Sequence, residues 1–243
     1  MTFAILDFGT NTFNLLIAER QNHSFQIIHN SKQPVKLGRG GIQVNRMTPD
    51  AFERGFVAIA NHMETIRSFE VDEIKAFATS AIRNAANGQE FVDEVKARFG
   101  IRVRVIPGKR EAELIYKGVR QALPMKKEKM MILDIGGGSN EFIICNQDGI
   151  IWKQSFEIGM ARILERFTLS DPITHEEVRA LESYFRQELE PLMAVVMKEK
   201  PMALIGASGS FDTFYALISH KLGLQADGDN GREISLKAYT ELH

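Results

Sequence analysis

The chain has 243 residues, which is enough for one large domain or two of ordinary size. Its 44% hydrophobic and 25% charged residues are typical of a soluble globular protein, and its formal net charge of −1 offers no general attraction to nucleic acid or to an anionic membrane. The single cysteine, Cys145, excludes an intrachain disulfide and fits a reducing compartment. A cytoplasmic location is expected, since neither a signal peptide nor an apolar run of about 18 residues is apparent.

The first half of the chain opens with short strands. Apolar runs between polar turns predict strands at residues 3–6, 13–19, 25–29 and 33–37. Thr48 and Pro49 suit the start of a helix, and apolar residues then recur at helical spacing as far as Ile66. Further strands are predicted at 74–78 and 103–106, with helices from Thr79, over 89–99 and over 109–122.

After residue 122 the pattern restarts. Leu123–Lys129, with Pro124 and several lysines, predicts an exposed linker. Strands follow at 130–133, 142–145, 150–156 and 203–205, with helices near Gly159, over 174–197 and after Gly209. Strand-rich hairpins followed by strand–helix units thus occur twice. This repetition predicts an α/β architecture of two related lobes, residues 1–123 and 124–243.

Two stretches at matching places in these lobes resemble each other. Each is an apolar strand ending in an aspartate, Asp7 or Asp134, then a turn rich in glycine and small polar residues, then a second apolar strand. Glycines allow backbone N–H groups to approach an anion closely. The predicted phosphate-binding residues of the two turns are Gly9, Thr10, Asn11 and Thr12, and Gly136, Gly137, Gly138 and Ser139. The alternative is a pair of ordinary glycine-rich hairpins.

Carboxylates and cations beside these turns add to the phosphate hypothesis. Asp134 and Glu141 flank the second turn and suit Mg²⁺, held mainly through water. Arg83 lies near a predicted helix start and could bind phosphate, although a surface arginine is the commoner outcome. Another strand-to-helix turn could hold phosphate or nucleotide or be only a tight turn; its candidate residues are Gly206, Ser208 and Gly209.

Glu111 is the candidate general base. At helical spacing it shares a face with Ile115, Gly118 and Ala122, whereas Glu113 points elsewhere. A carboxylate on an apolar face that borders a cleft is partly desolvated, which raises its pKa and lets it accept a proton from water near neutral pH. The alternative is a glutamate that only favours the helix dipole.

Five segments together resemble the exopolyphosphatase / guanosine pentaphosphate phosphohydrolase family. They are residues 7–12, 78–85, 106–116, 134–142 and 206–210, in the family's order. That family is similar to acetate and sugar kinases, heat-shock chaperones and actin. The resemblance implies two ribonuclease-H-like (actin-like ATPase) lobes with a central cleft. It also implies hydrolysis of the terminal phosphoanhydride of inorganic polyphosphate with Mg²⁺, with Glu111 as base, Asp134 near the metal and the attacking water, and Arg83 as a phosphate ligand.

Other readings stay open. The substrate could be guanosine pentaphosphate, with a base pocket near residues 206–210, or the chain could be an ATP-binding module like the chaperones and actin. Arg110, Pro107 and Asn140 stand where the family usually has Glu, Ser and Thr, which puts rate and substrate preference in question. The family also suggests a homodimer. Its members continue beyond the point that corresponds to His243, so either this sequence is incomplete or the second lobe is trimmed.

Overall fold

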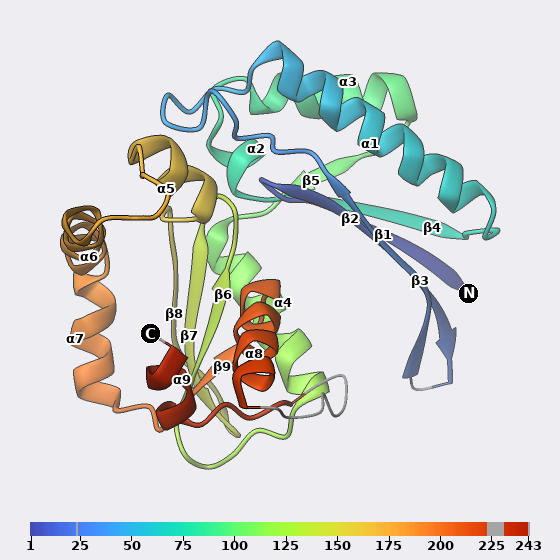
Figure 1. Cartoon of the computed structure of the whole chain (residues 1–243). Coiled ribbons are helices and arrows are strands. Elements are labelled where there is room, and N and C mark those ends of the chain that lie inside the picture. Colours follow the sequence, from blue (N-terminus) through green and yellow to red (C-terminus); the bar gives the residue numbers. More distant parts are fainter. Residues whose placement is uncertain (23, 223–230, 243) are drawn as a thin grey trace. The chain divides into compact units, whose positions relative to one another are not determined.

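The computed structural model describes residues 1–22, 24–222 and 231–242 and divides the chain into two compact units, each built on its own sheet (Figure 1). Unit 1 comprises Met1–Gly108, Gly136–Ser139 and Glu157–Phe185. Unit 2 comprises Lys109–Ile135, Asn140–Phe156 and Arg186–His243. The turn at residues 136–139, which lies in the second half of the sequence, therefore packs with unit 1. The units are defined by packing, so the domains 1–123 and 124–243 stay a prediction, as does the cleft.

The sheet of unit 1 has five strands in the order β3-β2-β1-β4-β5. The first three strands along the chain pair antiparallel, whereas β4 pairs parallel with β1, and β5 parallel with β4. The strands and helices of the first half of the chain are β1 (Thr2–Phe8), β2 (Thr12–Gln21), β3 (Ser24–Pro34), α1 (Pro49–Arg67), β4 (Glu73–Ala78), α2 (Ser80–Asn84), α3 (Gly88–Phe99) and β5 (Val103–Val105).

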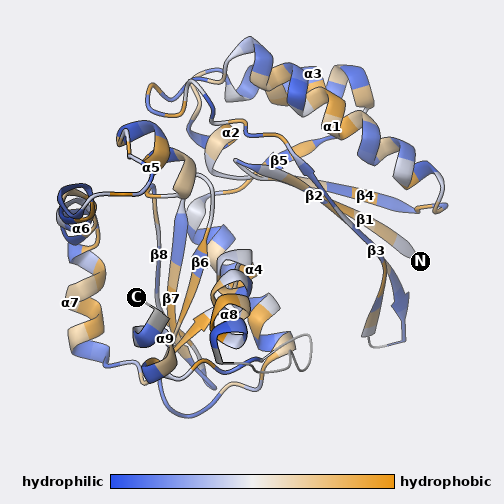
Figure 2. Cartoon of the chain, viewed as in Figure 1, coloured by the Kyte–Doolittle hydropathy of each residue, from blue (hydrophilic) through white to orange (hydrophobic). Residues whose placement is uncertain are grey.

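Alternating burial along β1 and β2 places large side chains in the core of unit 1, where α1 and α3 cover them. Phe8, Phe13 and Phe91 are fully buried. The Phe91 ring, on α3, stacks on Phe56 of α1 with centroids 5.2 Å apart. Hydrophobic and hydrophilic residues alternate along α1, as expected for a helix with one buried face (Figure 2). This core fixes the carboxyl end of β1, from which the first glycine turn leaves.

Thr48 caps α1 as the sequence predicts, and its removal is expected to destabilise unit 1 modestly. Its hydroxyl accepts from the Ala51 N–H at 3.2 Å. We expect Thr48→Ala to lower the free energy of unfolding by about 1 kcal/mol, because the Ala51 N–H loses its side-chain acceptor and keeps only the Thr48 carbonyl at 3.0 Å. Thr65→Ala, at an exposed hydroxyl within the same helix, is the control. Urea unfolding measures both, and equal losses would contradict the capping role.

The sheet of unit 2 has four strands in the order β8-β7-β6-β9. Again the first three strands along the chain pair antiparallel, and the fourth, β9, pairs parallel with the first. Helix α4 packs on this sheet through Ala112 and Tyr116. The remaining elements are α4 (Gly108–Ala122), β6 (Met130–Ile135), β7 (Asn140–Asn146), β8 (Gly149–Phe156), α5 (Met160–Arg166), α6 (His175–Glu188), α7 (Glu190–Glu199), β9 (Ala203–Gly206), α8 (Gly209–Leu222) and α9 (Leu236–Leu242).

The strand order β3-β2-β1-β4 is repeated by β8-β7-β6-β9, with the same parallel and antiparallel pairings. The predicted α/β class with two related lobes is therefore confirmed. Among the helices of the described residues, none combines the length and the apolar character that crossing a membrane requires.

Two predicted element boundaries are wrong. Residues 25–29 and 33–34 belong to a single strand, β3, because Asn30, Ser31 and Lys32 continue to pair with β2, and residues 35–37 lie beyond its end. An edge strand with one open side tolerates such polar residues. The helix predicted over 174–197 is two helices, since α6 ends at Glu188 and α7 begins at Glu190. Pro191 lacks the N–H that a continuous helix would need there, and its ring clashes with the preceding turn.

Candidate active site

The two glycine turns are built alike. In the β1–β2 turn the Gly9 N–H donates to the Thr12 carbonyl at 3.1 Å, and in the β6–β7 turn the Gly136 N–H donates to the Ser139 carbonyl at 3.1 Å. A Cβ at Gly9 would lie 2.8 Å from the Thr12 oxygen, and one at Gly136 would lie 2.5 Å from the Ser139 oxygen. Glycine is therefore required at the first position of both turns.

The turns also meet within unit 1. A Cβ at Gly137 would lie 2.8 Å from Cγ of Asn11, and one at Gly138 would lie 2.4 Å from Oγ1 of Thr10 and 2.5 Å from Oγ of Ser80. Thr10 and Ser80 are buried. The structure thus brings together the residues that the sequence predicts for phosphate binding in the two turns. We call Thr10, Asn11, Ser80, Gly137 and Gly138 the glycine cradle.

The carbonyl groups of the β6–β7 turn are held by the start of α5. The Gly138 carbonyl accepts from the Gly159 N–H, the Gly136 carbonyl from Met160 and the Gly137 carbonyl from Ala161, at 3.2, 3.0 and 2.8 Å. Because the C=O and N–H of a trans peptide point in opposite directions, the N–H groups of Gly137 and Gly138 point away from α5.

The β1–β2 turn is held in the same way by the chain that follows β3. The Asn11 carbonyl accepts from the N–H groups of Val35 and Lys36, and the Thr10 carbonyl accepts from Leu37 at 2.7 Å. The N–H of Asn11 is accordingly directed away from that segment. Backbone N–H groups oriented in this way, with small hydroxyls beside them, form an arrangement that binds anions.

Arg83 lies beside the cradle, but a carboxylate of the protein already pairs with the guanidinium group that was predicted to bind phosphate. Its Nη2 pairs with Oε1 of Glu157 at 3.1 Å, and its Nη1 donates to the Ile106 carbonyl at 3.1 Å. Oε2 of Glu157 accepts from the Ser80 hydroxyl at 2.6 Å and pairs with Arg162 at 3.2 Å. Burial raises the pKa of Glu157, but hydrogen bonds from Ser80, Asn84 and Arg83 outweigh it and leave that pKa below its ordinary value.

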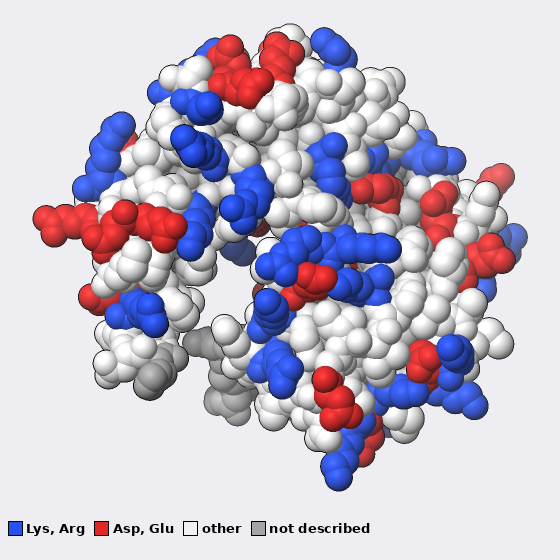
Figure 3. All heavy atoms as spheres, turned by 180° about the vertical axis from the view of Figure 1, so that it is seen from behind, with Lys and Arg blue, Asp and Glu red and all other residues white. Residues whose placement is uncertain are grey.

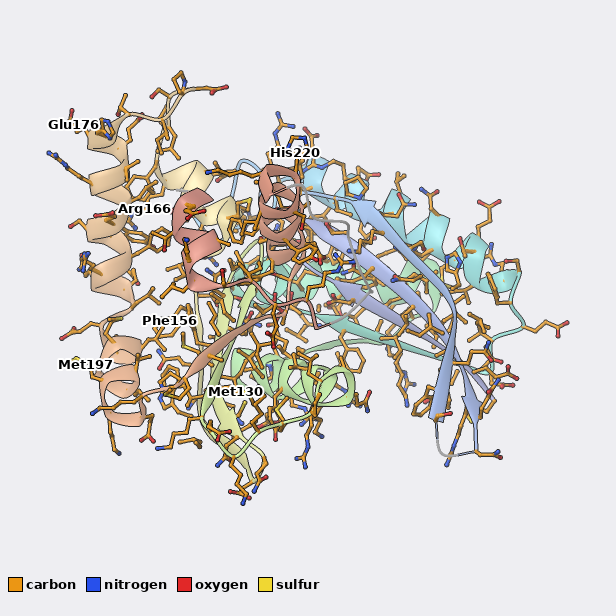
Figure 4. All side chains as sticks on the ribbon, turned by 60° about the horizontal axis from the view of Figure 1, so that its bottom comes forward. Met130, Phe156, Arg166, Glu176, Met197 and His220 are labelled. Carbon is orange, nitrogen blue, oxygen red and sulfur yellow. The ribbon has the colours of Figure 1, made fainter. Side chains whose placement is uncertain are left out.

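Glu157 and Arg162 were not identified from the sequence as candidate site residues. Besides Glu157, Arg162 contacts the Gly138 carbonyl through Nε at 3.0 Å and the Ile42 carbonyl through Nη1 at 3.2 Å. In Figure 4, Phe156 and Arg166 mark the two ends of the segment that carries both residues. Gly159, a third glycine after a strand, was the available signal. A Cβ there would lie 2.5 Å from backbone atoms of Gly137 and Gly138.

The predicted metal-binding carboxylates are cross-strand neighbours. Asp134 on β6 pairs in register with Glu141 on β7, which pairs with Ser155 on β8, so the three side chains share one face of the sheet. Glu141 is 2% exposed, and its Oε1 accepts from the Ser155 hydroxyl at 2.6 Å. At the matching place in the first hairpin, Asn14 donates to Asp7, whose pKa is raised by burial despite that hydrogen bond. A cross-strand pair of two carboxylates is therefore present in the second hairpin, whereas the matching pair in the first hairpin is a carboxylate and an amide.

Glu111 lies in the first turn of α4. The prediction that it shares one buried face with Ile115, Gly118 and Ala122 is partly wrong. The buried residues of α4 are Ala112 and Tyr116, with Ile115 and Val119 packed beside them, whereas Gly118 and Ala122 are exposed. Interactions with the sheet of unit 2 turn the helix by about one position. Glu111 is half-buried, at the edge of the buried face.

The neighbouring charges on α4 are paired. Arg110 Nη1 lies 2.7 Å from Oε2 of Glu113, whose other oxygen pairs with Lys153. Hydrogen bonds from Lys153 and then Arg110 lower the pKa of Glu113 to about 2. Glu113 is thus an ion-paired residue. Arg110 thus has an ion-pair partner on its own helix, three residues further on.

The third predicted phosphate turn has structural contacts of its own. A Cβ at Gly206 would lie 1.9 Å from Cγ of Phe211, so glycine is needed there for packing. The Ser208 hydroxyl accepts from the Ile135 N–H at 3.1 Å and holds the turn against the end of β6. Gly209 begins α8. The phosphate role of these three residues stays a prediction.

Charge over the surface gives no broad attraction to a polyanion. On the face in Figure 3, Lys and Arg side chains are interspersed with Asp and Glu, in keeping with the formal net charge of −1. An anion would therefore be recognised by a local group of donors such as the cradle and its arginines.

Comparison with known proteins agrees with the predicted family. A family model described as the Ppx/GppA phosphatase family matches residues 16–241. Exopolyphosphatase 2 of Mycobacterium tuberculosis is 31% identical over 223 residues, covering 88% of this chain and 70% of that protein. The crystal structure of an exopolyphosphatase from Cytophaga hutchinsonii has a TM-score of 0.90 at 38% identity, covering 93% of this chain and 73% of that one.

Relatives with lower sequence identity include a protein named for guanosine pentaphosphate hydrolysis and a further solved structure of the family. A guanosine-5'-triphosphate,3'-diphosphate pyrophosphatase from Photobacterium profundum is 29% identical, covering 86% of this chain and 42% of that protein. The crystal structure of the Aquifex aeolicus Ppx/GppA family member has a TM-score of 0.72 at 27% identity, covering 94% of this chain and 72% of that one. With the family model matching most of its length, the chain belongs to the Ppx/GppA phosphatase family.

Proposed function

We propose that this chain is an exopolyphosphatase, which hydrolyses the terminal phosphoanhydride of inorganic polyphosphate and releases orthophosphate. The observation that supports it most directly is the β6–β7 hairpin, whose turn presents the N–H groups of Gly137 and Gly138 and whose strands carry Asp134 and Glu141 on either side of the turn in the sequence. The exopolyphosphatases of Mycobacterium tuberculosis and Cytophaga hutchinsonii, similar over about nine-tenths of this chain, support the same substrate.

In the proposed mechanism the cradle holds the terminal phosphate and Glu111 activates water. N–H groups of the two turns and the guanidinium of Arg83 bind the phosphate oxygens. The Glu111 carboxylate accepts a proton from a water molecule as its oxygen attacks the terminal phosphorus. The bond to the bridging oxygen breaks, and that oxygen leaves on the shortened chain.

The residues of the hairpin fit Mg²⁺ better than a metal held wholly by protein. Among the described residues no group of three or more His, Cys, Asp or Glu side chains could hold a metal ion. Two cross-strand carboxylates beside a phosphate-binding turn suit Mg²⁺, which takes one or two carboxylates and completes its shell with water and phosphate oxygens. Asp134 and Glu141 would hold it. When bound, it supplies positive charge that offsets the charge on the phosphate oxygens.

Ser155 offers a test of this metal site, because its hydroxyl donates to Glu141 at 2.6 Å. Partners that orient metal ligands are typically worth 10- to 100-fold in affinity, so we expect Ser155→Ala to raise the Mg²⁺ concentration for half-maximal activity about tenfold. Ser219→Ala is the control, since that buried hydroxyl has no partner among the described residues. An unchanged Mg²⁺ requirement in Ser155→Ala would count against Glu141 as a ligand.

Phosphate release from long-chain polyphosphate, followed in time with Mg²⁺ or with a chelator, tests the function. Release one phosphate at a time from the chain end, lost on chelation, is the expected result. No release under either condition, together with tight ATP binding, would favour the nucleotide-binding module instead.

Guanosine pentaphosphate is the second candidate substrate, favoured by the similarity to the Photobacterium profundum pyrophosphatase. Competition at equal concentrations separates the two. Preferential loss of polyphosphate supports the main proposal, and preferential hydrolysis of the nucleotide supports the alternative.

A cytoplasmic location and a homodimer are further proposals. The single cysteine, Cys145, is buried and suits a reducing compartment. Analytical ultracentrifugation at several concentrations tests the homodimer, and fractionation of cells tests the location.

A further inference from the structure

One exposed carboxylate occupies side-chain donors in and beside the cradle to which the proposed function assigns phosphate. Glu157 accepts from Ser80 at 2.6 Å and pairs with Arg83 at 3.1 Å and with Arg162 at 3.2 Å. The Ser80 hydroxyl is also one of the two groups that a Cβ at Gly138 would meet, at 2.5 Å. The carboxylate therefore satisfies the same kinds of group, a hydroxyl and two guanidinium ions, that bind phosphate oxygens.

Exposure distinguishes the carboxylate from its partners. The Glu157 side chain is 41% exposed, whereas Arg83 is 15% and Arg162 is 12% exposed. The carboxylate thus lies on the solvent side of both arginines, the side from which a dissolved anion arrives. A partly exposed ion pair of this kind is weak enough to be exchanged for another anion.

The donors do not depend on Glu157 for their positions. Arg162 is also held by the carbonyls of Gly138 and Ile42, at 3.0 and 3.2 Å. Arg83 is also held by the Ile106 carbonyl at 3.1 Å. If the carboxylate swings away, both guanidinium groups keep a protein partner and stay near the cradle.

We propose that Glu157 is an internal anion that occupies the side-chain donors Ser80, Arg83 and Arg162 and is displaced from them by the terminal phosphate of the substrate. This inference rests on the proposed function for its substrate, but not for its binding test. It makes Glu157 a residue that sets affinity rather than one that performs chemistry. Its competition with substrate keeps the cradle from retaining the product orthophosphate tightly.

The experiment compares binding of inorganic phosphate and of tripolyphosphate to the wild-type chain and to Glu157→Gln by calorimetry. Glutamine keeps the size of the side chain but removes the charge that competes. We expect dissociation constants about two- to fivefold lower, the factor that corresponds to a partly exposed ion pair. In the hydrolysis assay KM should fall by a similar factor, with kcat little changed. Glu94→Gln, which removes an ion-paired charge on α3, should change neither value.

The opposite results are also informative. Weaker or unchanged anion binding by Glu157→Gln would overturn the proposal and indicate that Glu157 only positions the arginines. Binding by neither protein would overturn it as well. A wild-type chain that releases no phosphate from polyphosphate, with tighter anion binding by Glu157→Gln, would instead refute the proposed substrate and leave this inference standing.

Discussion

Glu111→Gln is expected to lower kcat for polyphosphate hydrolysis by about 10²–10⁴-fold, since that is the usual contribution of one positioned general base. Glutamine has nearly the shape of glutamate but cannot take a proton from water. KM should change little, because the proposed phosphate contacts come from the cradle and Arg83. Initial rates of phosphate release over a range of polyphosphate concentrations separate the two parameters.

The same helix offers the control. Glu113 is two residues away and pairs with Arg110 and Lys153, so Glu113→Gln removes a carboxylate from α4 without touching the proposed base. Because exposed ion pairs contribute little, this variant should keep activity within about twofold and unfold near the wild-type temperature. Wild-type turnover in Glu111→Gln, or equal losses in both variants, would remove Glu111 from the mechanism.

Local patterns predicted most of the fold. Thr48 and Pro49 marked the start of α1 correctly, because capping depends on residues adjacent in sequence. The repeated pattern of hairpins and strand–helix units predicted two related lobes, and the two sheets do share one strand order over four strands. The errors came from tertiary context. Polar residues 30–32 looked like a turn but pair with β2, and the burial of α4 is centred on Ala112 and Tyr116 rather than on the face of Glu111.

The site was predicted less completely, for a physical reason. Sequence reasoning found the two glycine turns because each turn is a local motif. It missed Glu157 and Arg162, whose significance arises only when α5 packs on the carbonyls of Gly136, Gly137 and Gly138. That packing joins segments more than twenty positions apart, and a single sequence carries no record of it beyond Gly159.

The two glycine turns are supported in the same way, because in each case a later segment of the chain donates hydrogen bonds to the carbonyl groups of the turn. In unit 1 the N–H groups of residues 35–37 hold the carbonyls of Thr10 and Asn11, and those of residues 159–161 hold the carbonyls of Gly136 to Gly138. Each turn is thereby fixed with its carbonyls on one side. Such preorganised N–H groups need not reorient when an anion binds, which is what electrostatic catalysis requires.

Gly138→Ala is expected to reduce phosphate release at least about 100-fold, since displacing binding groups by about 1 Å is enough for such a loss. The added Cβ would lie 2.4 Å from Oγ1 of Thr10 and 2.5 Å from Oγ of Ser80. Both residues are buried, so they cannot give way without moving the cradle. Overpacking of this kind typically also costs about 1–3 kcal/mol of stability.

Gly118→Ala is the matched control, because within the described part of the chain no atom beyond its own helix backbone and chain neighbours lies within 4 Å of a Cβ at Gly118, in the middle of α4. Alanine there should leave activity unchanged and raise the free energy of unfolding by about 0.5–1 kcal/mol. Urea unfolding and phosphate binding, measured on both variants, separate loss of fold from loss of the cradle. A folded Gly138→Ala protein that binds phosphate and turns over polyphosphate normally would show that close contact between the two turns is not needed for binding, because the substitution alters that contact before anything else.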